Sequence, residues 1–265
     1  MTATHIESIV AVLCLGAVLG VVSMAVPQAV AEDFRIENKV YARAAIGTEK
    51  LASRSTTIFF GDMVFDYLDQ PSEVIVFDRI GRRFVLLDTD RRVRAELSTD
   101  EVAAFTARLR ASAEDHDSPF IRFLATPEFD EQFDAQQGEL TLASQFVTYQ
   151  LNLAPSGSEA VVAQYREFSD WLAQVNTLLR PGSNPPFARL MVNAALATYD
   201  STAKEVHLTV TPKKTFPPTR VKLRSEHKLS RSLAQGDLAR VKQTQQFMAI
   251  FEQIGIEEYR KKLAE

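Results

Sequence analysis

The stretch from Thr56 to Leu97 decides the fold; it reads TTIFFGDMVFDYLDQPSEVIVFDRIGRRFVLLDTDRRVRAEL. Short runs rich in Val, Ile, Leu and Phe alternate in it with turns that contain Gly, Pro or Asp. Every connection between two runs is too short for a crossover helix, so consecutive strands have to run antiparallel. The stretch therefore predicts an antiparallel meander, with strands over residues 55–60, 63–68, 73–78, 83–88 and 92–97.

Further strands are predicted on both sides of the meander. Upstream, Phe34, Ile36, Val40 and Ala42 share one parity, which indicates a strand with one buried face. Downstream, alternating apolar residues predict strands over residues 128–133, 139–153, 205–211 and 219–229. Together these strands predict a curved antiparallel sheet shaped as an open half-barrel.

Helices are predicted where apolar residues recur at intervals of three and four. Ser98 and Glu101 have the spacing of a capping box, so a helix should begin there. The strongest helical periodicity covers residues 158–179, and a shorter helix should follow Pro185. A last helix is predicted from residue 237 or 238 to about residue 262, with a possible break at Gly255. Its residues predicted to face the body are Leu238, Val241, Gln245, Met248 and Phe251.

The first 31 residues have the pattern of a secretory signal peptide. Residues 9–22 form an apolar run of signal-peptide length, and Ala29-Val30-Ala31 supplies the small residues required for cleavage. We expect export by a Sec-type signal, cleavage after Ala31 and a periplasmic or secreted protein without a stable transmembrane span. A retained segment would instead anchor the protein in a membrane. Residues 32–265 are predicted to be a single α+β domain, a sheet covered by helices, with a polar linker at residues 112–118.

Composition excludes several classes of protein. With 46% hydrophobic and 24% charged residues, the chain is an ordinary globular protein and is neither disordered nor collagenous. A formal net charge of −4 speaks against a general nucleic-acid binder. The single cysteine, Cys14, lies in the predicted signal peptide, so the exported part has no disulfide framework.

Residues capable of catalysis are few and scattered. Ser201-Thr202-Ala203-Lys204 matches the S-x-x-K motif of penicillin-recognising enzymes, but the partner motifs of those enzymes are missing, so a serine hydrolase is the weakest alternative. His116 lies in the polar linker, while His207 and His227 alternate with apolar strand residues and are predicted to be structural. No metal site and no cofactor are predicted.

Basic residues gather near the C-terminal strands. Arg220, Lys222, Arg224 and Lys228 share one face of the strand predicted over residues 219–229. One interpretation is an anion-binding stripe. The other is a solvated outer face, since charged residues commonly protect an exposed strand face.

The rhythm of the meander resembles the central part of the periplasmic lipoprotein-carrier fold of the LolA and LppX type. The resemblance rests on strands separated by Gly-Asp or Asp-x-x-Gly turns and followed by aromatic strands within residues 56–97. It implies an open half-barrel whose concave side is covered by helices and holds acyl chains. The chain also looks like one of the secreted bacterial families of unassigned function.

These observations predict a non-catalytic extracytoplasmic protein that binds an apolar ligand, lipid or lipoprotein, or an envelope partner, between sheet and helices. Phe65 and Tyr67 on one strand, and Val74 and Val76 on the next, are predicted to line the cavity, because alternate residues share a face. The alternative is a structural or interaction module of the cell envelope with a filled core. A cavity in the concave face, or its absence, separates the two.

Overall fold

One open sheet runs through the computed structural model, which describes residues 32–43, 48–180, 182–212 and 221–263. Its strands are β1 (Phe34–Arg43), β2 (Lys50–Phe60), β3 (Met63–Leu68), β4 (Glu73–Asp78), β5 (Arg83–Asp88), β6 (Val93–Ser98), β7 (Asp130–Asp134), β8 (Glu139–Ala143), β9 (Val147–Pro155), β10 (Ser201–Val210), β11 (Val221–Ser230) and β12 (Glu252–Gln253). The helices of the described part are α1 (Thr99–Glu114), α2 (Pro119–Ala125), α3 (Glu159–Leu179), α4 (Phe187–Thr198), α5 (Gln235–Ile250) and α6 (Ile256–Leu263). The predicted α+β class is confirmed, and the sheet is not closed into a barrel.

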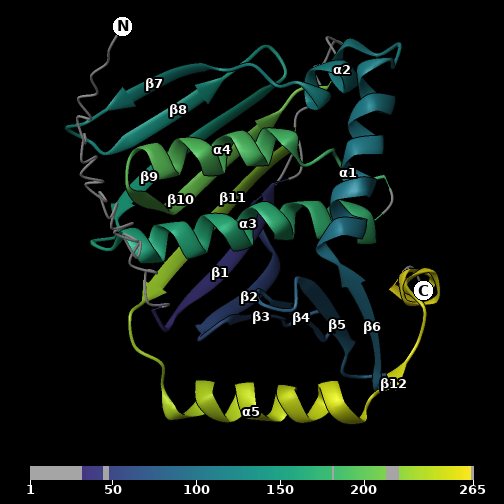
Figure 1. Ribbon diagram of the computed structural model, residues 1–265. Coiled ribbons are helices and arrows are strands. Elements are labelled where there is room, and N and C mark those ends of the chain that lie inside the picture. Colours follow the sequence, from purple (N-terminus) through teal and green to yellow (C-terminus); the bar gives the residue numbers. More distant parts are fainter. Residues whose placement is uncertain (1–31, 44–47, 181, 213–220, 264–265) are drawn as a thin grey trace, which may run out of the picture.

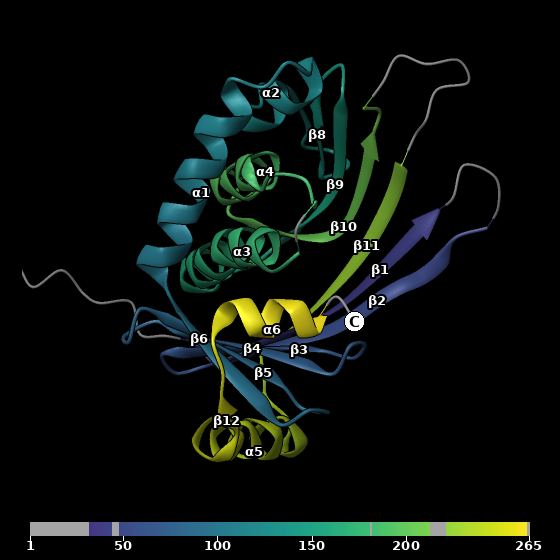
Figure 2. The same cartoon turned by 90° about the vertical axis from the view of Figure 1, so that its right-hand side faces the viewer.

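The strand order is β12-β6-β5-β4-β3-β2-β1-β11-β10-β9-β8-β7. The short strand β12 pairs in parallel with β6, whereas the other neighbouring pairs are antiparallel. The pairing of β1 with β11 joins the meander to the C-terminal strands and so makes the two halves of the sheet continuous (Figure 1). Figure 2 shows the sheet curving around α3 and α4; we call the face that carries these helices the concave face.

The predicted meander is confirmed, because β2 to β6 pair in sequence order through tight turns. The turn between β4 and β5 shows why one of these positions is glycine. The amide of Gly81 donates to Oδ1 of Asp78 at 2.7 Å. A Cβ atom on Gly81 would lie 2.3 Å from Oδ2 of Asp78, so a larger residue would disrupt the turn.

The predicted helix starts are also confirmed by their caps. Glu101 donates its amide to Oγ of Ser98 at 3.2 Å, and the amide of Ser98 donates to the Glu101 carboxylate at 2.8 Å. The hydroxyl of Ser158 accepts from the amide of Val161 at 3.3 Å and caps α3. Both caps satisfy amides that the helix itself leaves without partners.

Two boundaries in the middle of the chain differ from the prediction. Residues 139–153 form two strands, β8 and β9, because Ser144 accepts from the amides of Phe146 and Val147 and turns the chain. The predicted polar linker at residues 112–118 is shorter than expected, since α1 continues to Glu114. The short helix α2, which follows Ser118, was not predicted.

The C-terminal helix was predicted with a possible break at Gly255, and the chain is interrupted just before that residue, which gives three elements. The chain leaves α5 at Phe251, whose backbone is extended, and β12 then adds to the sheet edge beside β6. Leu238 and Gln245 are exposed, contrary to prediction, because the buried stripe of α5 runs through Val241, Thr244 and Phe251.

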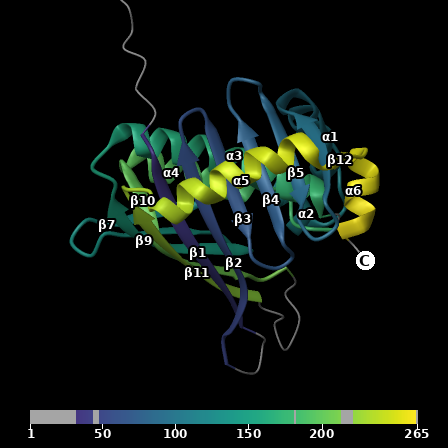
Figure 3. The same cartoon turned by 90° about the horizontal axis from the view of Figure 1, so that it is seen from below.

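The two faces of the sheet have separate cores. On the concave face, Phe59, Phe77 and Phe84 pack with the buried residues of α3 and α4. On the opposite face, which we call the convex face, Phe65 and Val76 pack with buried residues of α5. Figures 2 and 3 show α5 lying across the meander on the side away from α3.

The C-terminal segment packs against both faces of the sheet at the edge formed by β6 and β12. Phe251, at the end of α5, belongs to the convex core, while Tyr259, in α6, belongs to the concave core. The hydroxyl of Tyr259 donates to Oε1 of Glu73 at 3.3 Å, in a buried setting. Over the described ranges of the chain, no helix combines the length and apolar character needed to cross a membrane.

Candidate functional site

The four residues predicted to line a cavity lie together but beneath α5. Phe65 is opposite Val76, and Tyr67 is opposite Val74, so they share a face as expected. All four are buried, and the hydroxyl of Tyr67 lies 3.1 Å from Oγ1 of Thr244 in α5. This face is therefore the convex one, and the helix occupies the space that the prediction reserved for a ligand.

A hollow of about 430 Å³ does lie beside α5, and Tyr67 and Val74 border it. Most of its other walls are polar, and the guanidinium of Arg240 lies 3.9 Å from the centre of the Tyr67 ring. Such walls are unlike those of an apolar ligand site, which are mainly hydrophobic.

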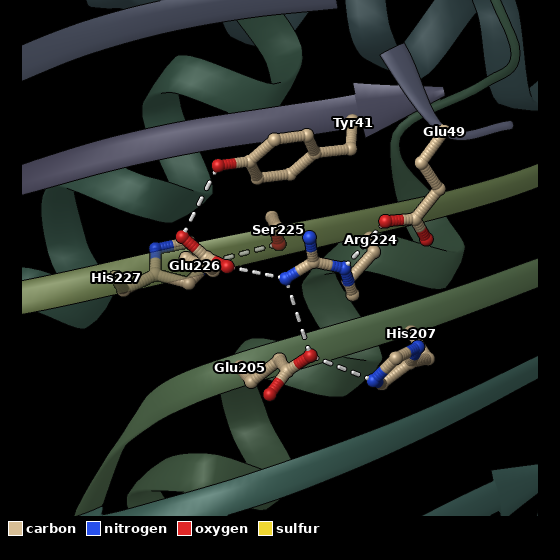
Figure 4. Close-up of polar contacts among 8 residues, drawn as sticks. All are labelled: Tyr41, Glu49, Glu205, His207, Arg224, Ser225, Glu226 and His227. Carbon is tan, nitrogen blue, oxygen red and sulfur yellow. Dashed lines mark hydrogen bonds and ion pairs between the residues drawn. The ribbon is translucent and has the colours of Figure 1, made fainter. Parts of the chain in front are cut away.

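Of the predicted basic stripe, Arg224 is the residue that carboxylates neutralise among the described residues. Arg220 lies outside the described residues, and Lys222 and Lys228 are exposed. Arg224 lies 3.0 Å from Glu49 and 3.5 Å from Glu205, and it also pairs with Glu226 (Figure 4). Hydrogen bonds from Arg224 lower the pKa of Glu226. An incoming anion at Arg224 would have to displace these acidic groups, which counts against an anion site there.

The S-x-x-K residues do not form a catalytic pair. Ser201 is the first residue of β10, is buried, and donates its hydroxyl to the carbonyl of Tyr199 at 2.9 Å. Lys204 is exposed, beside an irregularity in the pairing of β10 with β9. The motif requires a helix that brings the lysine over the serine, and neither residue is helical here.

The concave face contains three adjoining hollows along α3. The central hollow has a volume of about 290 Å³ and lies between α3 and strands β1, β2 and β11. The loop-side hollow, about 420 Å³, lies between α3, α4 and strands β9 and β10. The hairpin-side hollow, about 360 Å³, lies towards β3 and β4. Asn176 borders all three, and we call them together the α3 groove.

The walls of the groove change character along its length. The loop-side hollow is bordered by Val147, Tyr149, Leu208 and Val210 from the sheet. The central hollow has Phe168 and Leu172 on its helix side, and its floor on the sheet combines Val40 and Phe59 with several polar residues. The polar residues of this floor are Asn38, Ser55, Thr57, Ser225 and His227. A hollow with an apolar sheet wall therefore adjoins a hollow with several polar groups on its floor.

The polar floor is a hydrogen-bonded line across four strands. Thr57 donates to Oδ1 of Asp66 at 2.7 Å, and Nδ2 of Asn38 lies 3.3 Å from the Thr57 hydroxyl. The carbonyl oxygen of Asn38 lies 2.8 Å from Nδ1 of His227 and accepts its proton. The other ring nitrogen, Nε2, then accepts from the hydroxyl of Ser225 at 2.9 Å. The line thus fixes one tautomer of the imidazole.

Ser225, His227 and Asn38 follow one another in this line. A catalytic nucleophile that is activated by a base has the same arrangement of hydroxyl, imidazole and orienting group. Burial, together with the charge of Arg189, lowers the pKa of His227 to about 3. An imidazole with so low a pKa is a poor acceptor for a serine proton, because effective general bases have pKa values near the working pH. We therefore interpret the line as a structural floor.

Burial also raises the pKa values of two carboxyl groups near the groove. Desolvation raises the pKa of Asp66 to about 6, although Thr57 donates to its carboxylate. Desolvation also raises the pKa of Glu73, at the end of the hairpin-side hollow. Glu73 accepts from Arg180 at 3.0 Å and from Tyr259, so it ties the end of α3 to α6.

The sequence did not single out the groove residues. Arg189, Asn38 and Asp66 lie on three different elements, and no local spacing relates them. His227 was predicted to be structural, and its hydrogen bonds agree with that interpretation. One signal was present: Asn38 interrupts the buried parity that Phe34, Ile36 and Val40 set in β1.

Comparison with known proteins gives little beyond the fold. No family model matches the sequence, and no curated protein matches it. Among solved structures, the chain is similar to a LolA superfamily protein from Nitrosomonas europaea, at 9% sequence identity. The match covers 77% of this chain and 89% of that chain, with a TM-score of 0.30. Since this likeness is weak, the function has to be argued from the groove itself.

Proposed function

We propose that this protein is a non-catalytic, extracytoplasmic binding protein that holds one amphiphilic ligand, with its acyl chain in the α3 groove. The observation that carries the proposal is the run of adjoining hollows between α3 and the sheet, of about 290, 420 and 360 Å³. Small-molecule sites are typically concave, mainly apolar and roughly 300–1,000 Å³ in volume.

The contrast between the two faces supports this choice. Both faces of the meander carry aromatic residues, but α5 packs closely on the convex one, where Phe65 and Val76 are fully buried. Along α3, Leu172 and Ala173 are only half-buried although they face the sheet side of the helix and border hollows. Apolar side chains left partly open inside a protein are where an apolar ligand gains most from burial.

An interaction module of the cell envelope with a filled core is the second candidate. The convex face fits it, because α5 leaves Ile250 and Leu238 exposed on an otherwise polar helix. These two residues are isolated from each other by several polar positions, and scattered exposed apolar residues are normal on monomeric proteins. The groove therefore favours the ligand-binding proposal.

Native mass spectrometry of the protein purified from its own cell envelope tests the proposal. We expect an additional mass, of the size of a single lipid, on the folded protein that is lost on unfolding. A bare mass from gentle preparations would speak for the filled module. N-terminal sequencing of the same sample tests export, with a first residue of Glu32 expected after cleavage and Met1 expected for a retained anchor.

A further inference from the structure

Arg189 is a cation that borders two hollows of the groove. It lies in the first half of α4, is half-buried, and borders both the central and the loop-side hollow. Over the described ranges, its guanidinium forms no hydrogen bond or ion pair. The neighbouring arginine of the groove, Arg180, is instead held by Glu73 at 3.0 Å and by Asn176 at 2.7 Å.

The charge of Arg189 affects the pKa values of neighbouring groups. It contributes to the lowered pKa of His227 on the floor. It also partly offsets the rise that burial causes in the pKa of Tyr149. Arg189 also interacts electrostatically with Asp170 in α3, but the carboxylate of that residue accepts from Asn193 at 2.7 Å and lies 3.7 Å from Arg166. The guanidinium therefore keeps its donors available for a ligand.

The position of Arg189 fits the head of an amphiphile. It lies where the central hollow, with its polar floor residues, meets the loop-side hollow, with its apolar sheet wall. The other polar groups of the floor are already bonded to one another, from Asp66 through Asn38 to Ser225. A planar guanidinium whose donors bond to none of the described residues matches a carboxylate, which it can bind through two parallel hydrogen bonds.

We propose, building on the proposed function, that Arg189 recognises the carboxylate of a long-chain fatty acid whose chain lies in the loop-side hollow. A single arginine balances a monoanion, whereas a phosphate dianion would retain an uncompensated charge in a partly desolvated site. Neutral chains of equal length should enter the same hollow and lack only the head contact.

Competition binding with palmitic acid and hexadecanol tests this inference on the full-length protein. Each competes against a neutral fluorescent lipid, so that the readout does not depend on the head group. We expect wild type to prefer palmitate by about 10–100-fold, as a charge-assisted hydrogen-bond pair implies. Arg189→Gln should lose this preference while hexadecanol affinity changes by less than about 3-fold. Arg108→Gln, at an exposed position of α1, is the matched control and should keep it.

Three results would overturn the inference. If Arg189→Gln retains the preference for palmitate, the head contact is elsewhere, although the groove still binds chains. If wild type binds both competitors equally well, no carboxylate is recognised. If neither the probe nor either competitor binds to wild type, the proposed function itself fails, and the inference fails with it.

Discussion

The hydroxyl of Tyr67 lies 3.1 Å from Oγ1 of Thr244, which joins the third strand to α5 on the convex face. Thr244 also donates to the carbonyl of Arg240 one turn earlier, so Tyr67 supplies a proton to this pair. Burial accordingly raises the pKa of Tyr67. A buried, hydrogen-bonded tyrosine under a packed helix belongs to a core. This contact therefore shows that the convex face is filled, whereas the concave face carries the groove.

Replacing Phe65 with Asp should unfold the protein. Phe65 is fully buried between the sheet and α5, and an unpaired carboxylate there costs on the order of 4 kcal/mol or more. Leu172→Asp is the matched control, because Leu172 is half-buried and borders the groove, where water can reach a carboxylate. Urea unfolding followed by circular dichroism should show a folded Leu172→Asp variant. A folded, native-like Phe65→Asp variant would contradict the account of the convex face.

Phe168 should be the most sensitive position of α3. Its ring is buried and meets Phe59 edge-on, with ring centres 5.8 Å apart. Phe168→Ala should lower the free energy of unfolding by about 3–5 kcal/mol, since the ring anchors the helix to the sheet. Chemical denaturation measures it. A loss below about 1 kcal/mol would indicate that α3 is a loosely packed lid.

The carboxyl of Asp66 predicts a specific dependence of stability on pH. Burial raises its pKa from 3.8 to about 6, so ionisation is harder in the folded than in the unfolded state. The stabilisation from the protonated form is complete below about pH 4 and is lost as pH rises to about 6, an effect of about 3 kcal/mol. The difference in unfolding free energy between wild type and Asp66→Asn should therefore shift against wild type over this range. A constant difference from pH 4 to 7 would refute the assignment.

The contact of α6 with the sheet can be tested at Tyr259. Its buried hydroxyl donates to Glu73, so Tyr259→Phe should cost about 1–2 kcal/mol of stability. Tyr199→Phe is the control, because the Tyr199 hydroxyl donates to Glu131 at 2.6 Å in an exposed setting and should cost less than about 0.5 kcal/mol. Equal losses in both variants would mean that the buried bond of Tyr259 stabilises the protein no more than the exposed bond of Tyr199.

Local patterns explain why the meander could be predicted so closely. Alternation and short turns define β2 to β6, and the capping residues Ser98 and Ser158 set the helix starts. The sequence does not predict which helices cover each face of the sheet. Phe65 and Phe77 look alike in sequence, and only the path of the C-terminal segment around the edge of β6 decides that α5 covers one of them.

The groove could not be predicted from the sequence, because it too depends on tertiary packing. Its polar floor depends on the register of β1 with β11, which places Asn38 opposite His227 although they are far apart in the chain. Arg189 acquires its position from the packing of α4 beside α3, and a single arginine on a helix carries no local signal. Tertiary pairing creates the site, whereas local preference creates the elements.

Filling the groove with a side chain tests the central claim most directly. Ala173 in α3 borders both the central and the loop-side hollow, so Ala173→Trp should occupy the space where the acyl chain is proposed to lie. Ala104→Trp adds the same bulk at an exposed position of α1 and is the matched control. In titrations with a fluorescent long-chain fatty acid, we predict one site in wild type, unchanged affinity in Ala104→Trp, and loss of binding by about 10-fold or more in folded Ala173→Trp. Equal binding by all three proteins, or no binding by wild type, would contradict the account.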